Sequence, residues 1–179
     1  ANMYVTISGD DTHDGTSWES SKSSIQAAID ASSVGDTVFI AEGIYNQSIK
    51  VKDGVHVFGG YDAFTGNRDY EVYSTIIDGT GLGKAIVNQG SSFKNPTYFD
   101  GLVLQNANHS NNGGAVILKA NGILNNCTIN DCTTTGSGGA VYNSKSTLNA
   151  DSTTVFGGYT EENAIDSSKA NTATNAGAI

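Results

Sequence analysis

The sequence is poor in proline, in arginine and in charge of either sign. One proline and one arginine occur in 179 residues, and Asp, Glu, Lys and Arg together make up 15% of the chain. Eighteen acidic against nine basic side chains give a formal net charge of −9, which opposes binding to nucleic-acid phosphates and to anionic membrane surfaces. No apolar run approaches the roughly 20 residues of a membrane-spanning helix. Nucleic-acid-binding and membrane-spanning classes are therefore excluded.

Cysteine is also scarce, with Cys127 and Cys132 as its two occurrences. A zinc set is excluded, because no second cysteine pair or nearby histidine completes the four ligands. The pair forms either a local disulfide or two buried thiols. Each cysteine aligns with an apolar residue 25 positions earlier, Leu102 or Ala107, which favours buried thiols.

Glycine, asparagine and threonine are abundant in this sequence, in which charged residues are scarce. Glycine alone accounts for 22 residues. Asparagine and glycine suit turns, since both tolerate positive backbone φ angles, and threonine fits the pleated surface of a strand. This composition favours an all-β fold with many turns.

A repeat of 25 residues organises the middle of the chain. Gly-Gly-Ala-Val occurs at 113–116 and again at 138–141, and the strand-like segment 102–104 lies 25 residues before the similar segment 127–129. A strand-rich repeat of this length is typical of a solenoid in which each repeat forms one coil. The sequence therefore predicts a parallel β-helix with about six coils stacked roughly 4.8 Å apart.

The repeat can be extended in both directions. Phe-Gly-Gly-Tyr occurs at 58–61 and at 156–159, and strand ends between them predict that the two copies lie four coils apart on one face. A partial copy is visible at 163–169. Residues 170–179 offer no apolar cap, so we expect further C-terminal domains or end-to-end self-association there.

One helix is predicted, over residues 23–34. Ser23 and Gln26 match the two ends of a capping box, and Gly35 stops the helix. An apolar stripe at Ile25, Ala28 and Ile29 gives it one face to bury. We expect it to cover the first coil, which divides the chain into an N-terminal strand, loop and capping helix (1–36) and β-helix coils (37–179).

Several segments resemble the N-terminal part of secreted bacterial right-handed parallel β-helix proteins with the pectate-lyase-like fold. They are Tyr4-Val5, Gly9-Asp10, 14–18, 25–30, 35–38, 40–45, 59–61, Arg68-Asp69 and 75–79. The Gly-Gly-Ala-Val units resemble the GGA-[IV] repeats of polymorphic outer membrane proteins. The resemblance implies a right-handed β-helix with an N-terminal capping helix, extracellular or at the cell surface. Such proteins are often adhesins, and more distant relatives cleave polysaccharides.

Catalytic residues are not predicted. A polysaccharide lyase of this kind needs a cation or basic side chain and a strong base, and a hydrolase needs two spaced carboxylates. Arg68 is the sole arginine, the lysines are dispersed, and no Asp-x-Asp strand motif occurs. The resemblance implies that Arg68 and Asp69 are structural partners in a loop.

A metal site is predicted in the loop before the helix. Asp10, Thr12 and Asp14 place oxygen atoms at alternate positions ahead of Gly15, which partly matches a calcium-binding loop. The terminal glutamate of that motif is missing, because Glu19 comes too early. The alternative is a turn held by its own aspartate side chains.

Histidine and aromatic residues give weaker indications. His13, His56 and His109 lie in separate segments, and His56 is expected to face outward from a strand. The aromatic residues either stack on sugar rings or cover the loops and ends of the solenoid. Those considered are Tyr45, Phe58, Tyr61, Phe64, Tyr70, Tyr73, Tyr98 and Tyr159.

The sequence supports one leading functional hypothesis and two alternatives. The leading one is a non-catalytic extracellular or cell-surface β-helix module that acts as an adhesin or a structural stalk and binds a polysaccharide or host surface glycan. The first alternative is a fragment of a lyase or hydrolase that acts on acidic glycans. The second is a solenoid that self-assembles.

Overall fold

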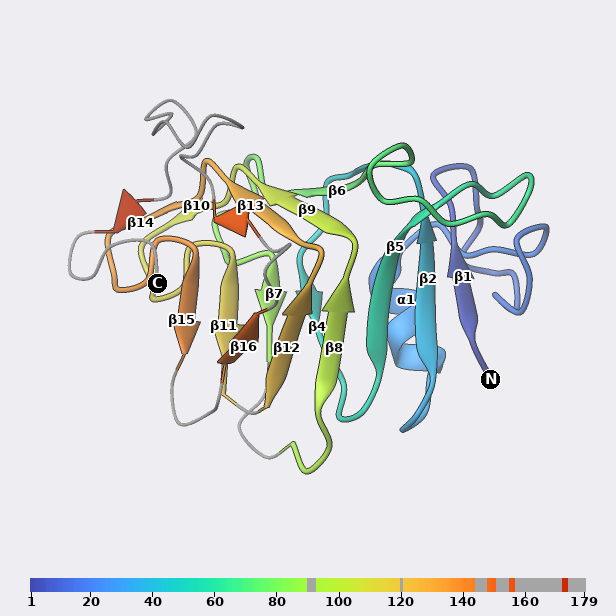
Figure 1. Ribbon diagram of the computed structural model, residues 1–179, viewed down its shortest axis with the longest axis horizontal. Coiled ribbons are helices and arrows are strands. Elements are labelled where there is room, and N and C mark those ends of the chain that lie inside the picture. The colour runs from blue at the N-terminus through green and yellow to red at the C-terminus, as the bar shows by residue number, and fades with distance from the viewer. Residues whose placement is uncertain (90–92, 120, 144–147, 151–154, 157–171, 174–179) are drawn as a thin grey trace.

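The computed structural model describes residues 1–89, 93–119, 121–143, 148–150, 155–156 and 172–173. Within these residues most of the regular structure is β-strand, together with one short helix, α1 (Ile25–Ala31). The strands form four sheets, A to D, and neighbouring strands in each sheet run parallel (Figure 1). The prediction of a mostly β, parallel fold is confirmed.

Each sheet collects strands from distant parts of the sequence. Sheet A contains, in order, β1 (Met3–Val5), β2 (Thr37–Ala41), β5 (His56–Tyr61), β8 (Thr97–Asp100), β12 (Gly122–Asn125) and β16 (Leu148–Ala150). Sheet B contains β3 (Gly43–Tyr45), β6 (Thr75–Asp78), β9 (Leu102–Gln105), β13 (Thr128–Asn130) and β17 (Val155–Phe156). Sheet C contains β4 (Ile49–Lys50), β7 (Val87–Asn88), β11 (Val116–Leu118) and β15 (Val141–Asn143). Sheet D contains β10 (Asn108–His109), β14 (Thr133–Thr134) and β18 (Thr172–Ala173).

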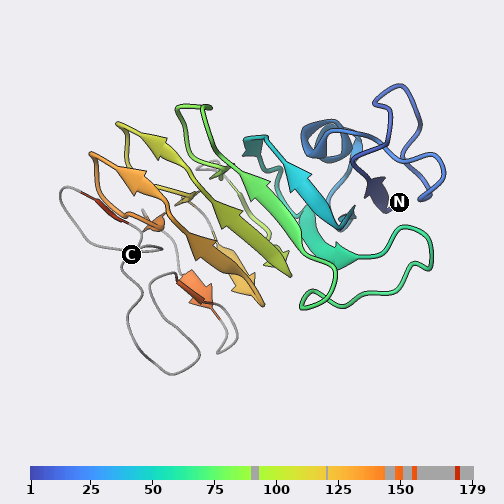
Figure 2. The same ribbon diagram turned by 90° about the horizontal axis from the view of Figure 1, so that it is seen from above.

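The chain visits these sheets in a fixed cyclic order. From β2 onward it passes through sheets A, B and C and then returns to sheet A, and from β10 onward sheet D is inserted between B and C. Each return places a strand beside the sheet-A strand of the previous circuit. Figure 2 shows the resulting stack of strands from above, with α1 at the end that holds the N-terminus.

The sheets enclose one apolar core, because alternate strand residues point inward. Paired core residues form columns that run from circuit to circuit. In sheet A one column is Val38, Val57, Phe99 and Leu124; in sheet B it is Tyr45, Ile77, Leu104 and Ile129; in sheet C it is Ile49, Val87, Val116 and Val141.

The 25-residue register is confirmed in sheets B and C. Val103 pairs with Thr128 in sheet B, and Val116 pairs with Val141 in sheet C. Gly113 and Gly138 begin the two Gly-Gly-Ala-Val units with φ angles of 80° and 74°, a region that glycine occupies without strain. Each unit therefore forms a corner followed by an inward-facing strand.

The predicted stacking of the two Phe-Gly-Gly-Tyr segments is wrong. Val57, in the strand that holds the first copy, lies in sheet A, whereas Ile77, in the next strand with a similar end, lies in sheet B and pairs with Tyr45. The second copy begins in sheet B, where Phe156 pairs with Ile129. Residues 62–74 separate β5 from β6, so the step from Val57 in sheet A to Ile77 in sheet B (77 − 57 = 20 residues) is close in length to a full coil. Residues 157–159 and the partial repeat at 163–169 lie outside the described residues.

The helix is shorter than predicted and has a different N-cap. It begins at Ile25, and Ser24 caps it by accepting a hydrogen bond from Ala27 N at 3.1 Å. Ser23 and Ser24 both donate their backbone N–H to Asp11 Oδ1, which holds them outside the helix. The helix ends at Ala31, well before Gly35, because the backbone of Ser32 is extended (φ −87°, ψ 159°), and the hydroxyl of Ser32 donates to the carbonyl of Ala28.

The helix covers the apolar core at the N-terminal end of the stack. Ile25, Ala28 and Ile29 are buried, as the stripe predicted, and α1 packs against β1, β2 and β4. Residues 1–36 thus contribute both this helix and the first strand of sheet A.

The two cysteines are buried thiols that form no disulfide with each other, which confirms the favoured prediction. Burial raises the pKa of Cys132 to about 12, so this thiol stays protonated.

Candidate functional site

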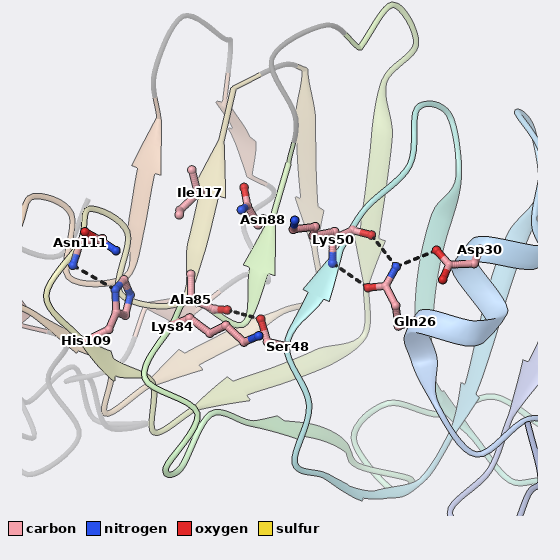
Figure 3. A pocket seen from close by; sticks show the side chains of 10 residues that line it. All are labelled: Gln26, Asp30, Ser48, Lys50, Lys84, Ala85, Asn88, His109, Asn111 and Ile117. Atoms are coloured by element: carbon pink, nitrogen blue, oxygen red, sulfur yellow. Dashed lines mark hydrogen bonds between the residues drawn. The ribbon is translucent and has the colours of Figure 1, made fainter.

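A groove of about 570 Å³ lies over the outer face of sheet C (Figure 3). Its floor is a column of outward-facing side chains on three neighbouring strands. Lys50 on β4 pairs with Asn88 on β7, and Asn88 pairs with Ile117 on β11. The inward-facing residues of the same strands are fully buried, so a rigid sheet supports the floor. We call this hollow the sheet-C groove.

Helix α1 closes one end of the groove through Gln26. The side-chain oxygen of Gln26 accepts a hydrogen bond from Lys50 N at 2.8 Å, and its side-chain nitrogen donates to Lys50 O at 3.1 Å. The same nitrogen donates to Asp30 Oδ1 at 2.9 Å (Figure 3). These bonds satisfy the edge of β4 as a neighbouring strand would, and they fix Gln26 and Asp30 at the groove's end.

The opposite end is formed by His109 and Asn111. Asn111 N donates to Nδ1 of His109 at 3.2 Å, so the ring proton of neutral His109 resides on Nε2. Nε2 then donates to the carbonyl of Gly113 at 2.6 Å. Buried and fully engaged, His109 fixes the corner of the Gly-Gly-Ala-Val unit and has no nitrogen left for chemistry in the groove.

Two lysines give the groove a local positive charge. Lys50 and Lys84 line it, and the single acidic residue in its lining is Asp30. In the part of the chain that the structure describes, neither ammonium forms an ion pair. Figure 3 shows the side chain of Lys50 extending toward Asn88. Two ammonium groups with nearby amides and a hydroxyl suit a ligand that carries carboxylates or sulfates and hydroxyls.

The loop in which calcium was predicted is held by its own side chains. Asp10 Oδ1 accepts hydrogen bonds from the backbone N–H and the hydroxyl of Thr12, at 2.8 and 2.7 Å. Asp14 Oδ1 accepts the equivalent pair from Thr16 and a third bond from Ser20. These bonds hold the pKa of both carboxyls below the usual range.

A lysine side chain also occupies the inner side of this loop. Lys22 is 8% exposed, and its ammonium donates to the carbonyls of Asp11 at 3.1 Å and of His13 at 2.6 Å. The loop thus already surrounds a positive charge. Among the described residues, no three His, Cys, Asp or Glu side chains are arranged to hold a metal ion. Calcium binding by Asp10, Thr12 and Asp14 stays a prediction.

Arg68 lies on the outer face of sheet A, away from the sheet-C groove. Its guanidinium forms an ion pair with Asp100 at 2.5 Å, donates to Gly59 O at 2.9 Å and lies 5.1 Å from the ring centroid of Phe58. Its acidic partner is therefore Asp100 and not the adjacent Asp69. Through this ion pair and hydrogen bond, Arg68 fastens the loop after β5 to the sheet.

Most of the aromatic residues considered for sugar contact pack against other parts of the fold. Phe58 and Tyr61 belong to a cluster with Phe39 on the outer face of sheet A, and Tyr61 also contacts Trp18. Tyr98 lies edge-on to His56, which faces outward as predicted. Tyr45 is buried, Tyr70 and Tyr73 are half-buried, and Tyr159 lies outside the described residues. Phe64 is different, since its side chain is fully exposed.

Sequence reasoning missed the sheet-C groove. Lys50, Asn88 and Ile117 belong to no motif, and only strand pairing brings them together. The signal that could have found them is the register of the inward column Ile49, Val87 and Val116, each of which precedes a floor residue by one position.

Comparisons with protein-family models, with curated proteins and with solved structures find no match for this chain. The described part of the chain holds no helix with the length and hydrophobicity that crossing a bilayer requires.

Proposed function

We propose that this chain is a right-handed parallel β-helix module of an extracellular or cell-surface protein, which binds an acidic glycan in the sheet-C groove without cleaving it. In this role it acts as an adhesin or as a stalk that presents the groove. The observation that carries the proposal is the pair of lysines, Lys50 and Lys84, in a groove of about 570 Å³ on a chain whose net charge is −9.

The position of the charge supports an acidic ligand. A chain with this surplus of carboxylates repels anions in general, so local attraction has to come from positive groups that lack acidic partners. Lys50 and Lys84 meet this condition among the described residues. Asn88, Asn111 and Ser48 add amide and hydroxyl groups that match the hydroxyls of a sugar.

The groups that line the groove support binding without cleavage. Hydrolysis of a glycosidic bond commonly uses two carboxyl groups, and the lining contains Asp30 alone. Lyase chemistry needs a base, and His109 is engaged on both ring nitrogens. The enzymatic alternative is a lyase whose base is one of the two lysines of the groove, Lys50 or Lys84. Self-association through the C-terminal end stays an expectation, because residues 174–179 lie outside the described residues.

Isothermal titration with a hexamer of galacturonic acid tests this proposal. We expect binding that weakens at least tenfold when Lys50→Ala and Lys84→Ala are combined, and that weakens further with salt. Lys94→Ala, an exposed lysine outside the groove, and Arg68→Ala serve as controls that leave the affinity unchanged. Equal affinity in the wild type and the double variant would overturn the proposed site. Chain cleavage that is lost in either single lysine variant would replace the module with the lyase.

A further inference from the structure

A second hollow, of about 340 Å³, lies at the N-terminal end of the molecule and shares no residue with the sheet-C groove. One wall is the loop that follows β1, and the other is the turn that follows β5. Its lining includes Ser8, His13, Trp18, Glu19, Ser21 and Phe64. We call it the cap pocket.

Phe64 lies in a turn that hydrogen bonds hold in place, and its side chain is exposed to solvent. Its side chain is 101% exposed, although burying a phenylalanine ring normally stabilises a fold by about 2 kcal/mol. Asp62 fixes the turn, because its carboxylate accepts hydrogen bonds from Phe64 N at 3.1 Å and from the hydroxyl of Thr65 at 2.7 Å. The turn therefore presents an apolar ring at the pocket's rim without using it for packing.

Trp18 supplies a second aromatic ring, and its position is fixed from behind. It lies edge-on to Tyr4, with ring centroids 4.8 Å apart, and tilted against Tyr61 at 5.6 Å. A large, anchored ring beside an exposed one offers flat apolar area at little cost in side-chain entropy.

Polar groups surround the two rings. The hydroxyls of Ser21 and Thr6 lie 2.7 Å apart, and His13 Nδ1 lies 3.2 Å from the carbonyl of Ser21. Glu19 is the one acidic residue in the lining, and no lysine or arginine is present there. Its pKa lies below the usual range, because its own backbone N–H and the Ser17 hydroxyl donate hydrogen bonds to it. The carboxylate is therefore ionised near neutral pH and accepts hydrogen bonds from a ligand.

We infer that the cap pocket binds a sugar ring that carries no negative charge, stacked against Phe64 and Trp18 and hydrogen-bonded by its hydroxyls to Glu19 and the serines. Flat C–H faces match the aromatic rings, and sugar hydroxyls match the carboxylate and hydroxyl groups. The ionised Glu19, with Asp10, Asp14 and Asp62 nearby in the same two loops, repels uronates and sulfated sugars. The two hollows thus differ in the charge of the sugar that each accepts.

The single tryptophan of the sequence makes this inference directly measurable, since Trp18 lies in the pocket. Titration with cellohexaose, a neutral glucose hexamer, is expected to shift Trp18 fluorescence in a saturable way. Phe64→Ala should weaken this binding about tenfold, as loss of one stacked ring predicts. Glu19→Gln should weaken it as well. Val72→Ala trims another solvent-exposed apolar side chain, outside the pocket, and should have no effect.

Failure of this inference is distinguishable from failure of the proposed function. The combined Lys50→Ala and Lys84→Ala variant should bind cellohexaose normally, and hexagalacturonate should leave Trp18 fluorescence unchanged. Three outcomes would overturn the inference: no fluorescence response to cellohexaose at millimolar concentration, an unchanged affinity in a folded Phe64→Ala variant, or a response to an oligolysine peptide in place of the sugar.

Discussion

The side chain of Gln26, on the helix, bonds to both backbone groups of Lys50, on the edge strand of sheet C. An edge strand exposes unpaired N–H and C=O groups that favour pairing with another chain. Here one glutamine side chain satisfies that edge, attaches the capping helix and fixes the backbone of a lysine in the proposed binding groove.

Replacing Gln26 should therefore loosen the edge of β4. Gln26→Glu removes the donor to Lys50 O and places a second carboxylate beside Asp30, so we expect a loss of about 2 kcal/mol in the free energy of unfolding. Urea denaturation measures the loss, and faster hydrogen exchange at the Lys50 amide localises it. Ala31→Gln, on the exposed side of the same helix, is the matched control. Unchanged exchange at Lys50 in Gln26→Glu would show that the two bonds do not hold the edge.

Lys22 should be essential for the loop that precedes the helix. Lys22→Met keeps the apolar stem but leaves the carbonyls of Asp11 and His13 without the ammonium, so we expect a loss of about 2–3 kcal/mol. Thermal unfolding with calcium and with a chelator tests the competing metal site in the same samples. If the Lys22 ammonium is the only cation in this loop, the wild-type Tm is the same with calcium and with the chelator. A Tm that rises with calcium and loses that rise in Asp10→Ala would instead establish the predicted calcium ligands.

Asp78 should control the stability of the fold in acid. Burial opposes its ionisation, but hydrogen bonds from Thr80, Gln105 and Asn106 outweigh burial and lower its pKa from 3.8 to about 2. The folded state therefore binds the proton less tightly than the unfolded chain, so the stabilisation is present above about pH 4 and is lost as the pH falls toward 2.

The matching variant is Asp78→Asn. It should lower stability by about 1–2 kcal/mol at pH 7, with solvent screening taken into account, and should flatten the fall in stability between pH 4 and pH 2. Urea denaturation at several pH values measures both effects. If the stability of the variant fell as steeply between pH 4 and pH 2 as that of the wild type, other carboxylates would be responsible for the loss of stability in acid.

The Gly-Gly-Ala-Val corner should not tolerate a side chain at its second glycine. A Cβ atom at Gly114 would overlap the carbonyl oxygen of Gly139 on the next circuit. We expect Gly114→Ala to destabilise the protein by more than about 4 kcal/mol. Gly81→Ala is the control, because Gly81 has a φ of 75° but open space around it, and should cost about 1 kcal/mol. Similar losses at both sites would contradict the close contact between circuits.

Sequence reasoning succeeded where a residue's role repeats from circuit to circuit. The spacing of Val116 and Val141 predicted their pairing, because a one-residue shift would expose the inward column. It failed where a distant partner decides the local structure. Ser23 and Gln26 match a capping box, but Gln47 accepts the Ile25 N–H and Gln26 turns to β4, so neither plays the predicted part.

The candidate sites show the same contrast between local patterns, which the sequence reveals, and distant partners, which it does not. Asp10 and Asp14 form a recognisable local pattern, yet the Lys22 ammonium that occupies the loop comes from outside that pattern. Lys50 and Lys84 have no sequence signature at all. Their common surface depends on strand register and on the loop between β6 and β7, which a single sequence does not encode in any local motif.

A glycan array probed with the wild type and with the combined Lys50→Ala and Lys84→Ala variant tests most directly whether the sheet-C groove binds acidic glycans. We predict that the wild type binds uronate-containing or sulfated glycans and that the variant loses those signals while any signals from neutral glycans remain. Retention of the acidic-glycan signals by a folded double variant would contradict the central claim that the sheet-C groove is the binding site.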